Sequence, residues 1–252
     1  MKQASFLIFS LTLITSFALA DDSKFISIFN GQNLDGWDSR AGAWEVEFDP
    51  TETELPAESG GTEGSAKKSE NGEIWCTGKD KEKNWLVWRE KQPANFILKM
   101  EFKWQAGNSG VQVRSDDLGD HQIFGYQVEV ARQEVMGLWH HSLLAKDHPR
   151  KEERHLMATA GQTVTIAEDG SRTIEQVADA EKLKSLVQEN GWNDLEIIAE
   201  GNTIVQKING VVFSKVIDDD VKMSRKKGFI ALQDHGKGCV VGFRKIRLKE
   251  LH

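Results

Sequence analysis

Five polar residues occupy alternating positions in short segments that are otherwise rich in apolar side chains. They are Glu101, Gln112, Arg114, Gln127 and Glu129. Residues two positions apart in a strand share a face, so these side chains would project from a sheet on the side opposite its apolar face. Amide, guanidinium and carboxylate groups in such an array can bind hydroxyl groups, and a carboxylate can also transfer a proton. An ordinary solvent-exposed sheet face would carry the same pattern, so that alternative stays open.

The segments that carry these residues have the period of β-strands. Asn95–Trp104 alternates most clearly, and Gly107–Gly110 has the composition of a turn. Asn209-Gly210 is the strongest hairpin signal, because both residues accept the positive φ angles of a type I′ turn. The sequence predicts the following apolar residues in the core: Phe96, Leu98, Met100, Phe102, Val111, Val113 and Val128.

Many short strands separated by Gly and Asn turns predict an all-β fold, an antiparallel sandwich of two sheets. One short helix is expected over residues 178–188 and a small hairpin over 163–175. Residues 47–72 are rich in Glu, Gly, Ser and Thr and are expected to form a long surface loop. Because no repeat or domain boundary is visible, we predict a single domain over 21–252 with loop insertions.

The first twenty residues have the composition of a secretory leader. Lys2 precedes an apolar run, and Ala18-Leu19-Ala20 supplies a small-residue cleavage site. We predict cleavage after Ala20 and a mature protein in the periplasm or outside the cell, with an uncleaved N-terminal anchor as the alternative. The net charge of −7 argues against a nucleic-acid or anionic-membrane partner.

The two cysteines and the clustered histidines each allow two interpretations. Cys76 and Cys239 could pair in an oxidising compartment, although a buried free thiol is the commoner state in such apolar segments. The histidines of one charged segment fit a solvated loop better than a metal site. They are His140, His141, His148 and His155. The sequence also lacks a phosphate-binding loop and the common zinc and serine-hydrolase motifs.

Seven short motifs resemble, in order, those of the 3-keto-disaccharide hydrolase domain family. They are Phe29–Trp37, Asn108–Arg114, Gly125–Glu129, Gly191–Asn193, Asn209-Gly210, Ala231–His235 and Phe243–Ile246. The resemblance covers about residues 26–251. It implies a concanavalin A-like jelly-roll sandwich of the lectin and glucanase type, export from the cell, and action on glycosides that are oxidised at C3.

Two positions depart from the pattern of that family. Gln127 and Glu129 exchange the acid and the amide of the corresponding motif, and Lys245 stands where the family usually has Asn. The exchange keeps both groups on one face of the strand but moves the carboxylate by about 7 Å.

The chemistry that the resemblance implies is removal of the C2 proton next to the ketone, expulsion of the group at C1, and addition of water. We predict Glu129 or His235 as the base, Arg114 as the cation that faces the enolate oxygen, and Glu101 as the residue that orients Arg114. Six residues are predicted to hold hydroxyl groups: Asn108, Gln112, Tyr126, Gln127, Gln233 and Asp234. A divalent metal ion on the carboxylates could replace Arg114 as the electrophile.

A non-catalytic, lectin-like module is the main alternative to an enzyme. The exchanged pair and the long loops favour this alternative, and a scaffold without a ligand is a third. A saccharide or 3-keto-glycoside is the predicted partner, whether the protein is an enzyme or a lectin-like module.

Overall fold

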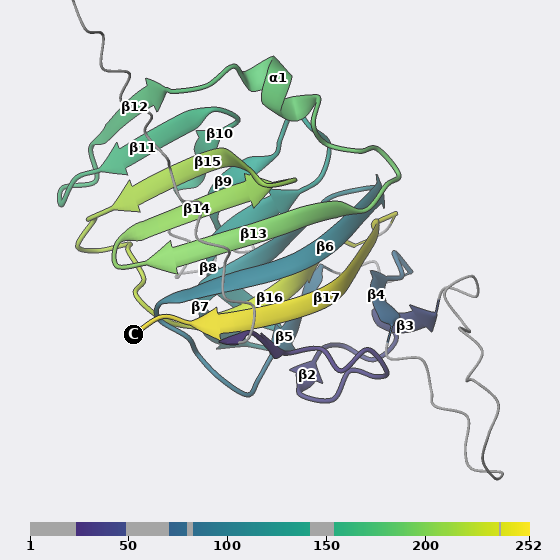
Figure 1. Cartoon of the computed structure of the whole chain (residues 1–252). Coiled ribbons are helices and arrows are strands. Elements are labelled where there is room, and N and C mark those ends of the chain that lie inside the picture. Colours follow the sequence, from purple (N-terminus) through teal and green to yellow (C-terminus); the bar gives the residue numbers. More distant parts are fainter. Residues whose placement is uncertain (1–23, 49–70, 80–82, 142–153, 237) are drawn as a thin grey trace, which may run out of the picture.

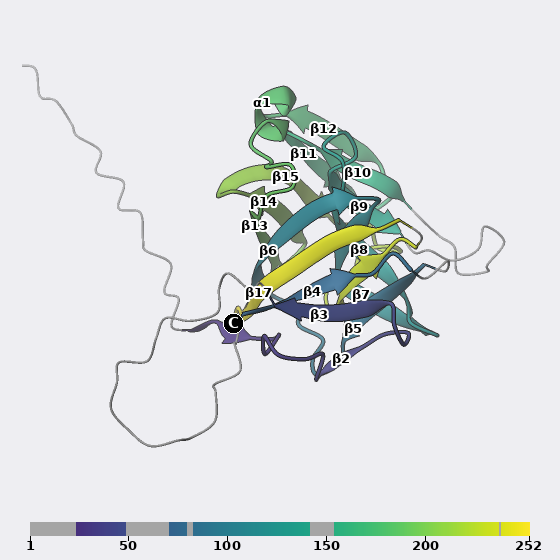
Figure 2. The same ribbon diagram turned by 90° about the vertical axis from the view of Figure 1, so that its right-hand side faces the viewer.

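Two β-sheets stacked face to face make up most of the described chain (Figure 1 and Figure 2). The computed structural model describes residues 24–48, 71–79, 83–141, 154–236 and 238–252. The ten-stranded sheet has the order β12-β11-β15-β14-β13-β6-β17-β4-β3, with β1 paired to β17. The seven-stranded sheet has the order β10-β9-β8-β7-β16-β5-β2. The predicted antiparallel sandwich is therefore confirmed, with one parallel pair between β11 and β15.

The strands of the ten-stranded sheet are β1 (Ile26–Ser27), β3 (Trp44–Phe48), β4 (Gly72–Cys76), β6 (Phe96–Ala106), β11 (Gln162–Ile166), β12 (Arg172–Gln176), β13 (Asn193–Glu200), β14 (Thr203–Ile208), β15 (Val211–Asp218) and β17 (Val240–Glu250). Those of the seven-stranded sheet are β2 (Trp37–Asp38), β5 (Asn84–Trp88), β7 (Ser109–Gly119), β8 (Gln122–Val130), β9 (Gly137–His141), β10 (His155–Thr159) and β16 (Phe229–Asp234).

The core lies between the two sheets and contains every residue that the alternation places there. Phe96, Phe102, Val111 and the other predicted members are at most 3% exposed. The predicted hairpin turn is also present, because Asn209 has φ 49° and Gly210 has φ 81°, which joins β14 to β15.

Some sequence predictions are changed or lie elsewhere. The helix α1 spans only Ala180–Lys184, because a single apolar residue of this charged segment, Leu183, is buried. Most of the predicted 47–72 loop, His148 and the leader lie outside the described residues. Among the helices described, none is long and apolar enough to cross a membrane.

Alternation along β7 breaks at Arg114, and this break shapes the candidate site. Arg114 has φ 50°, and the pairing of β7 with β8 shifts between Val113 and Asp116. A bulge of this kind lets two successive residues occupy the place of one. The side chain of Ser115 therefore takes the place on the outward face that strict alternation would give to Arg114, and its hydroxyl bonds Gln112 there.

Candidate functional site

Four predicted site residues form one hydrogen-bonded ladder across β7, β8 and β16. Ser115 Oγ donates to Gln112 Oε1 at 2.8 Å, and Gln112 Nε2 donates to Gln127 Oε1 at 3.2 Å. Gln127 Nε2 donates to Glu129 Oε2 at 2.5 Å and to Gln233 Oε1 at 3.0 Å. All five side chains are buried, so they do not form an ordinary solvated sheet face.

The ladder lies on the outward face of the seven-stranded sheet. Val111, Val128 and Leu232 belong to the core between the sheets, and the ladder residues alternate with them. A small second apolar cluster lies on this same outward face. It consists of Trp85, Val87, Ile123 and Ala231, with Phe229 packed against it.

A glycine lets the ladder reach from β8 to β16. A Cβ atom at Gly110 would lie 2.5 Å from Gln127 Nε2 and 2.7 Å from Gln127 Cγ, so the Gln127 side chain lies flat across β7 at this point. Because Gly110 leaves that space open, Gln127 spans β7 and meets Gln233 on the far side. The glycine of the Asn108–Arg114 motif is thus explained by this close approach.

Glu129 is the ionisable member of the ladder. Its burial raises the pKa to about 8, and the hydrogen bond from Gln127 offsets this only in part. Glu129 is therefore mostly protonated at neutral pH and becomes a carboxylate near pH 8. A carboxyl group with this pKa can accept a proton from a weak carbon acid more effectively than an ordinary glutamate.

Two N–H donors beside the ladder lack a hydrogen-bond partner within the described part of the chain. They are Gln233 Nε2 and Trp85 Nε1, and both side chains are fully buried. The two residues lie directly opposite each other on β16 and β5, so their side chains share the outward face. A buried N–H without an acceptor costs about 1–3 kcal/mol, which points to an oxygen atom of a ligand or water at this place.

The tip of the β7–β8 hairpin covers this end of the face. His121 O accepts a hydrogen bond from Trp85 N at 3.3 Å, and Gln122 Nε2 donates to Lys83 O at 3.0 Å. Ile123 of the same hairpin packs in the small apolar cluster with Trp85. The hairpin tip therefore packs over the Trp85 side of this face, and the half-buried Trp139, the cross-strand partner of Gln127, lies on the other side of the ladder.

Asn108 and His235 lie at the Glu129 end of the ladder. Asn108 immediately precedes β7, where Gly110 pairs with Glu129, and His235 immediately follows β16. Both side chains are half-buried. Burial, reinforced by the charge of Lys83, lowers the pKa of His235, so this imidazole is neutral at neutral pH.

Arg114 does not face the ladder, and the expectation that it shares the face of Gln112 is wrong. Its Nε donates to Ala94 O at 2.8 Å, and its Nη atoms donate to Gly201 O at 2.9 Å and Asn95 Oδ1 at 3.2 Å. The bulge turns the guanidinium toward the ten-stranded sheet. Arg114 therefore ties two turns of that sheet to β7.

Glu101 lies on the outer side of the other sheet, so the predicted pair between Glu101 and Arg114 is wrong. Glu101 accepts hydrogen bonds from Arg244 Nε at 2.7 Å and Lys245 Nζ at 2.8 Å. The reason is topological: β6 and β7 follow each other in the chain but belong to different sheets. Glu101 borders a shallow surface hollow with Lys99 and Lys245.

Two predicted hydroxyl-binding residues point between the sheets instead. Tyr126 lies opposite Val113 in the core, and its hydroxyl donates to Asp218 Oδ2 at 2.5 Å. Asp234 accepts hydrogen bonds from Asn84 Nδ2 at 3.4 Å and Gly236 N at 2.9 Å on the inner side of β16. Each residue is adjacent in sequence to a ladder residue, and alternation turns it to the opposite face.

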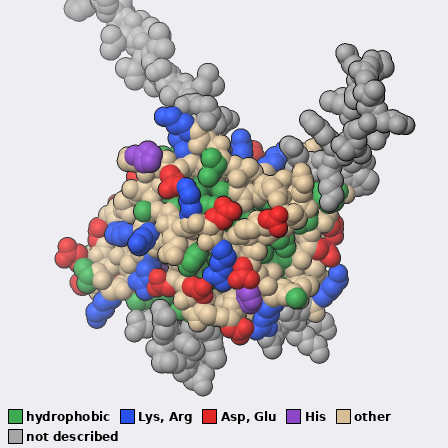
Figure 3. All heavy atoms as spheres, turned by 90° about the horizontal axis from the view of Figure 1, so that it is seen from below, with side chains coloured by type: hydrophobic (Ala, Val, Ile, Leu, Met, Phe, Trp, Pro, Cys, Tyr) green, Lys and Arg blue, Asp and Glu red, His purple; other side chains and the backbone are tan. Residues whose placement is uncertain are grey.

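Sequence reasoning missed Trp85 and Trp139. The alternation in β5 could have placed Trp85 with Val87 on one face, but no sequence signal reveals that its indole N–H lacks an acceptor. Elsewhere the surface is mixed: Figure 3 shows basic and acidic side chains interspersed over the face seen from below. Within the described residues, the side chains that could converge on a metal ion are Cys76, Asp234 and Cys239, on the inner side rather than in the ladder.

Comparison with known proteins supports the fold and assigns the family. No curated protein matches the chain. A candidate glycosyl hydrolase from Parabacteroides distasonis is 18% identical with a TM-score of 0.53, over 90% of this chain and 100% of that one. A protein of unknown function with a galectin-like fold from Bacillus subtilis is 10% identical with a TM-score of 0.51, over 88% of this chain and 94% of that one. At such identities these likenesses establish the fold alone. The model of the 3-keto-alpha-glucoside-1,2-lyase-like domain matches residues 24–249, and the chain belongs to that family.

Proposed function

We propose that this protein cleaves the glycosidic bond of 3-keto-glycosides by removing the proton at C2. The observation that carries the proposal is the buried ladder, in which Glu129 has a raised pKa and Gln127 links it to Gln233, whose Nε2 lacks an acceptor. Membership in the 3-keto-alpha-glucoside-1,2-lyase-like family supports the substrate class.

Glu129 is the base in this proposal. Its carboxylate takes the C2 proton, the electron pair forms a C1–C2 double bond conjugated with the C3 ketone, and the C1–O bond to the aglycone breaks. The proton then passes from Glu129, through solvent, to the departing aglycone oxygen, which restores the carboxylate. Water then adds its hydroxyl to C1 and a proton to C2, which gives the free 3-keto sugar. Gln127 orients Glu129 through the 2.5 Å hydrogen bond, and Gln112 in turn holds Gln127.

The enolate oxygen at C3 needs donors, and the structure favours neutral ones over Arg114. Gln233 Nε2 and Trp85 Nε1 are buried and preorganised, so they can stabilise developing negative charge without reorganisation. The half-buried His235 and Asn108, at the Glu129 end, are suited to the leaving-group oxygen and to sugar hydroxyls. Trp139 offers a ring against which a sugar can stack.

The decisive experiment uses a 3-keto-glucoside with a chromogenic aglycone, with the unoxidised glucoside as the control. We expect aglycone release from the keto form alone, and exchange of its C2 proton with solvent deuterium. Glu129→Gln should lose at least ~1,000-fold in turnover, about 4 kcal/mol, because the amide cannot accept the proton. In wild type, kcat/KM should rise with pH and level off near pH 8.

A lectin-like module would give a different result. Saturable binding of the sugar without aglycone release and without C2 exchange would reject the enzyme and assign a binding protein. Equal rates for wild type and Glu129→Gln would reject the proposed base while keeping the reaction.

We also propose that the chain is exported and cleaved after Ala20. The support is the leader composition of residues 1–20. N-terminal sequencing of the secreted protein should begin at Asp21, and a sequence that begins at Met1 would contradict cleavage.

A further inference from the structure

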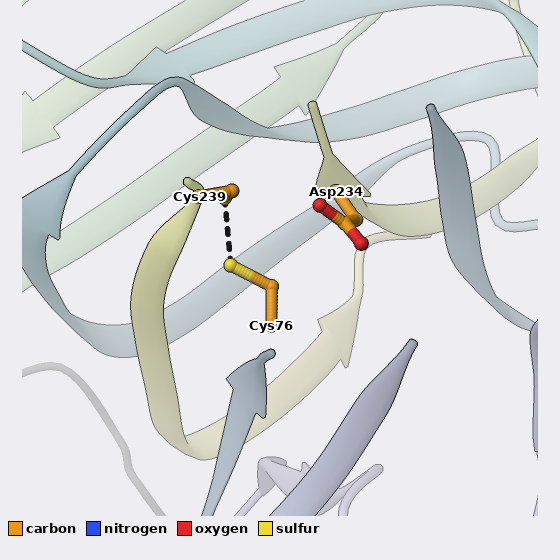
Figure 4. A group of neighbouring side chains, drawn as sticks. All are labelled: Cys76, Asp234 and Cys239. Carbon is orange, nitrogen blue, oxygen red and sulfur yellow. Dashed lines mark hydrogen bonds between the residues drawn. The ribbon is translucent and has the colours of Figure 1, made fainter. Parts of the chain in front are cut away.

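The two cysteines of the chain meet in the core, 163 positions apart in sequence. Cys76 ends β4, and Cys239 immediately precedes β17, which pairs with β4. Both side chains are buried, and their Sγ atoms lie 2.6 Å apart (Figure 4). We propose that Cys76 and Cys239 form a disulfide bond when the protein folds in an oxidising environment.

The backbone around Cys239 is held against Cys76 by tight packing. A Cβ atom at Gly78 would lie 2.4 Å from Cys239 O, and one at Gly107 would lie 2.8 Å from Cys239 Cα. In addition, Cys76 Sγ accepts a hydrogen bond from Val241 N at 3.3 Å. The two sulfur atoms are therefore brought together by the pairing of strands and by glycines that leave room for the backbone.

A metal site is the competing use of this cluster, because Asp234 lies beside the two cysteines (Figure 4). Two thiolates on one tetrahedral zinc ion, each at about 2.3 Å, would be separated by about 3.8 Å. From the observed 2.6 Å the sulfur atoms would have to separate by about 1.2 Å to bind zinc, whereas a disulfide requires an approach of only about 0.5 Å. The Asp234 carboxylate is already held by Asn84 Nδ2 and Gly236 N.

The surroundings also determine when oxidation occurs. The contact with Cys239, burial and the nearby charge of Asp234 all raise the pKa of Cys76. Because both thiols are buried, an external disulfide cannot reach them once the sheets have closed. The bond must therefore form during folding, by exchange with an external disulfide.

The disulfide bond forms through two successive thiol–disulfide exchange reactions. One cysteine thiolate attacks the external disulfide, such as that of glutathione or a thiol–disulfide oxidoreductase, and releases one external thiol. The second cysteine thiolate then attacks this mixed disulfide and releases the second external thiol. The chain loses two hydrogen atoms and two electrons, and the external disulfide gains them.

The test is oxidative refolding of the full chain with glutathione and glutathione disulfide. The product is then unfolded and alkylated without a reductant. We expect no alkylation, a mass lower by about 2 Da than the reduced chain, and a single peptide pair that joins Cys76 to Cys239. Reduction in denaturant followed by refolding without oxidant should lower the Tm by about 10–20 °C, because the bond closes a very long loop.

A matched control is the double variant Cys76→Ala with Cys239→Ala, whose Tm should not respond to the reductant. The mass measurement on wild type does not depend on whether this variant folds. Two alkylated cysteines after oxidative refolding would overturn the proposal. So would one equivalent of zinc that is retained by wild type and lost in Cys76→Ser.

Discussion

The outward faces of the two sheets each carry a polar cluster. The two clusters differ in how many of their charged and hydrogen-bonding groups have partners within the protein. On the ten-stranded sheet, Glu101 bonds to Arg244 and Lys245, and Arg244 also bonds to Glu73. On the seven-stranded sheet, the ladder contains a single carboxyl group, Glu129, held by an amide, with no cation bonded to it among the described residues.

This difference separates a structural cluster from a ligand-binding one. Charges that neutralise one another at a surface need no further partner. The buried N–H groups of Gln233 and Trp85 stay costly until another molecule supplies an oxygen atom to accept their hydrogen bonds. Polar residues on a strand are therefore a weak indicator of function, and what their partners leave unsatisfied is a stronger one.

The largest effect should come from the buried carboxyl group of Glu129. Its folded-state pKa of about 8 exceeds the ordinary value of 4.5, so the folded state holds an extra proton between these pH values. The stability that Glu129 contributes is thus complete below about pH 4.5 and is lost as the pH rises through 8. From pH 4.5 to 9, wild type should lose on the order of 4 kcal/mol relative to Glu129→Gln.

Urea unfolding of both proteins across this pH range measures the difference. If the free energies of unfolding of the two proteins changed with pH in parallel, Glu129 would be solvated. The ladder would then not differ from the ion-pair cluster around Glu101.

The next effect concerns Arg114, which belongs to neither cluster. Lys cannot span Ala94 O, Gly201 O and Asn95 Oδ1 with one ammonium group, so Arg114→Lys should destabilise the fold by about 2–3 kcal/mol. Turnover per folded molecule should stay within about twofold of wild type. If Arg114→Lys had a normal Tm and a tenfold loss of turnover, Arg114 would have to act in the catalytic site.

A smaller effect should follow from filling the space at Gly110. Gly110→Ala should displace Gln127 from Glu129 and Gln233 and reduce turnover by about tenfold, about 1.4 kcal/mol. Because the added methyl group acts through Gln127, the loss should vanish when Gly110→Ala is made in a Gln127→Ala background. Equal losses in both backgrounds would mean that Gly110 acts on the strand itself.

The errors and successes of the sequence predictions have separate physical causes. Alternation states which side of its strand a residue faces, so Phe102 and Val111 were predicted correctly as core. It does not state which sheet a strand joins, which is why Glu101 was wrongly paired with Arg114. It also fails at a bulge, such as the one at Arg114.

At two positions the motif resemblance and the alternation of the strand predict opposite faces, and the structure agrees with the alternation. Tyr126 and Asp234 are neighbours of ladder residues, so the period of two already places them on the inner face. The unpaired N–H of Trp85 was beyond sequence reasoning, because it depends on the acceptors that the folded chain brings near.

The smallest effect should come from Glu101, the counterpart of Glu129 on the opposite sheet. Burial alone would raise the pKa of Glu101, but the hydrogen bonds from Lys245 and Arg244 lower it overall. Its contribution is therefore present at neutral pH and is lost as the pH falls below the ordinary value of 4.5. Because Lys245 is exposed and the partly buried Arg244 retains Glu73, Glu101→Gln should cost no more than about 1 kcal/mol at pH 7. Turnover should be unchanged. Urea unfolding at pH 7 and pH 3.5, with a rate measurement on the same preparation, checks both statements; a tenfold loss of turnover would show that the two faces are coupled.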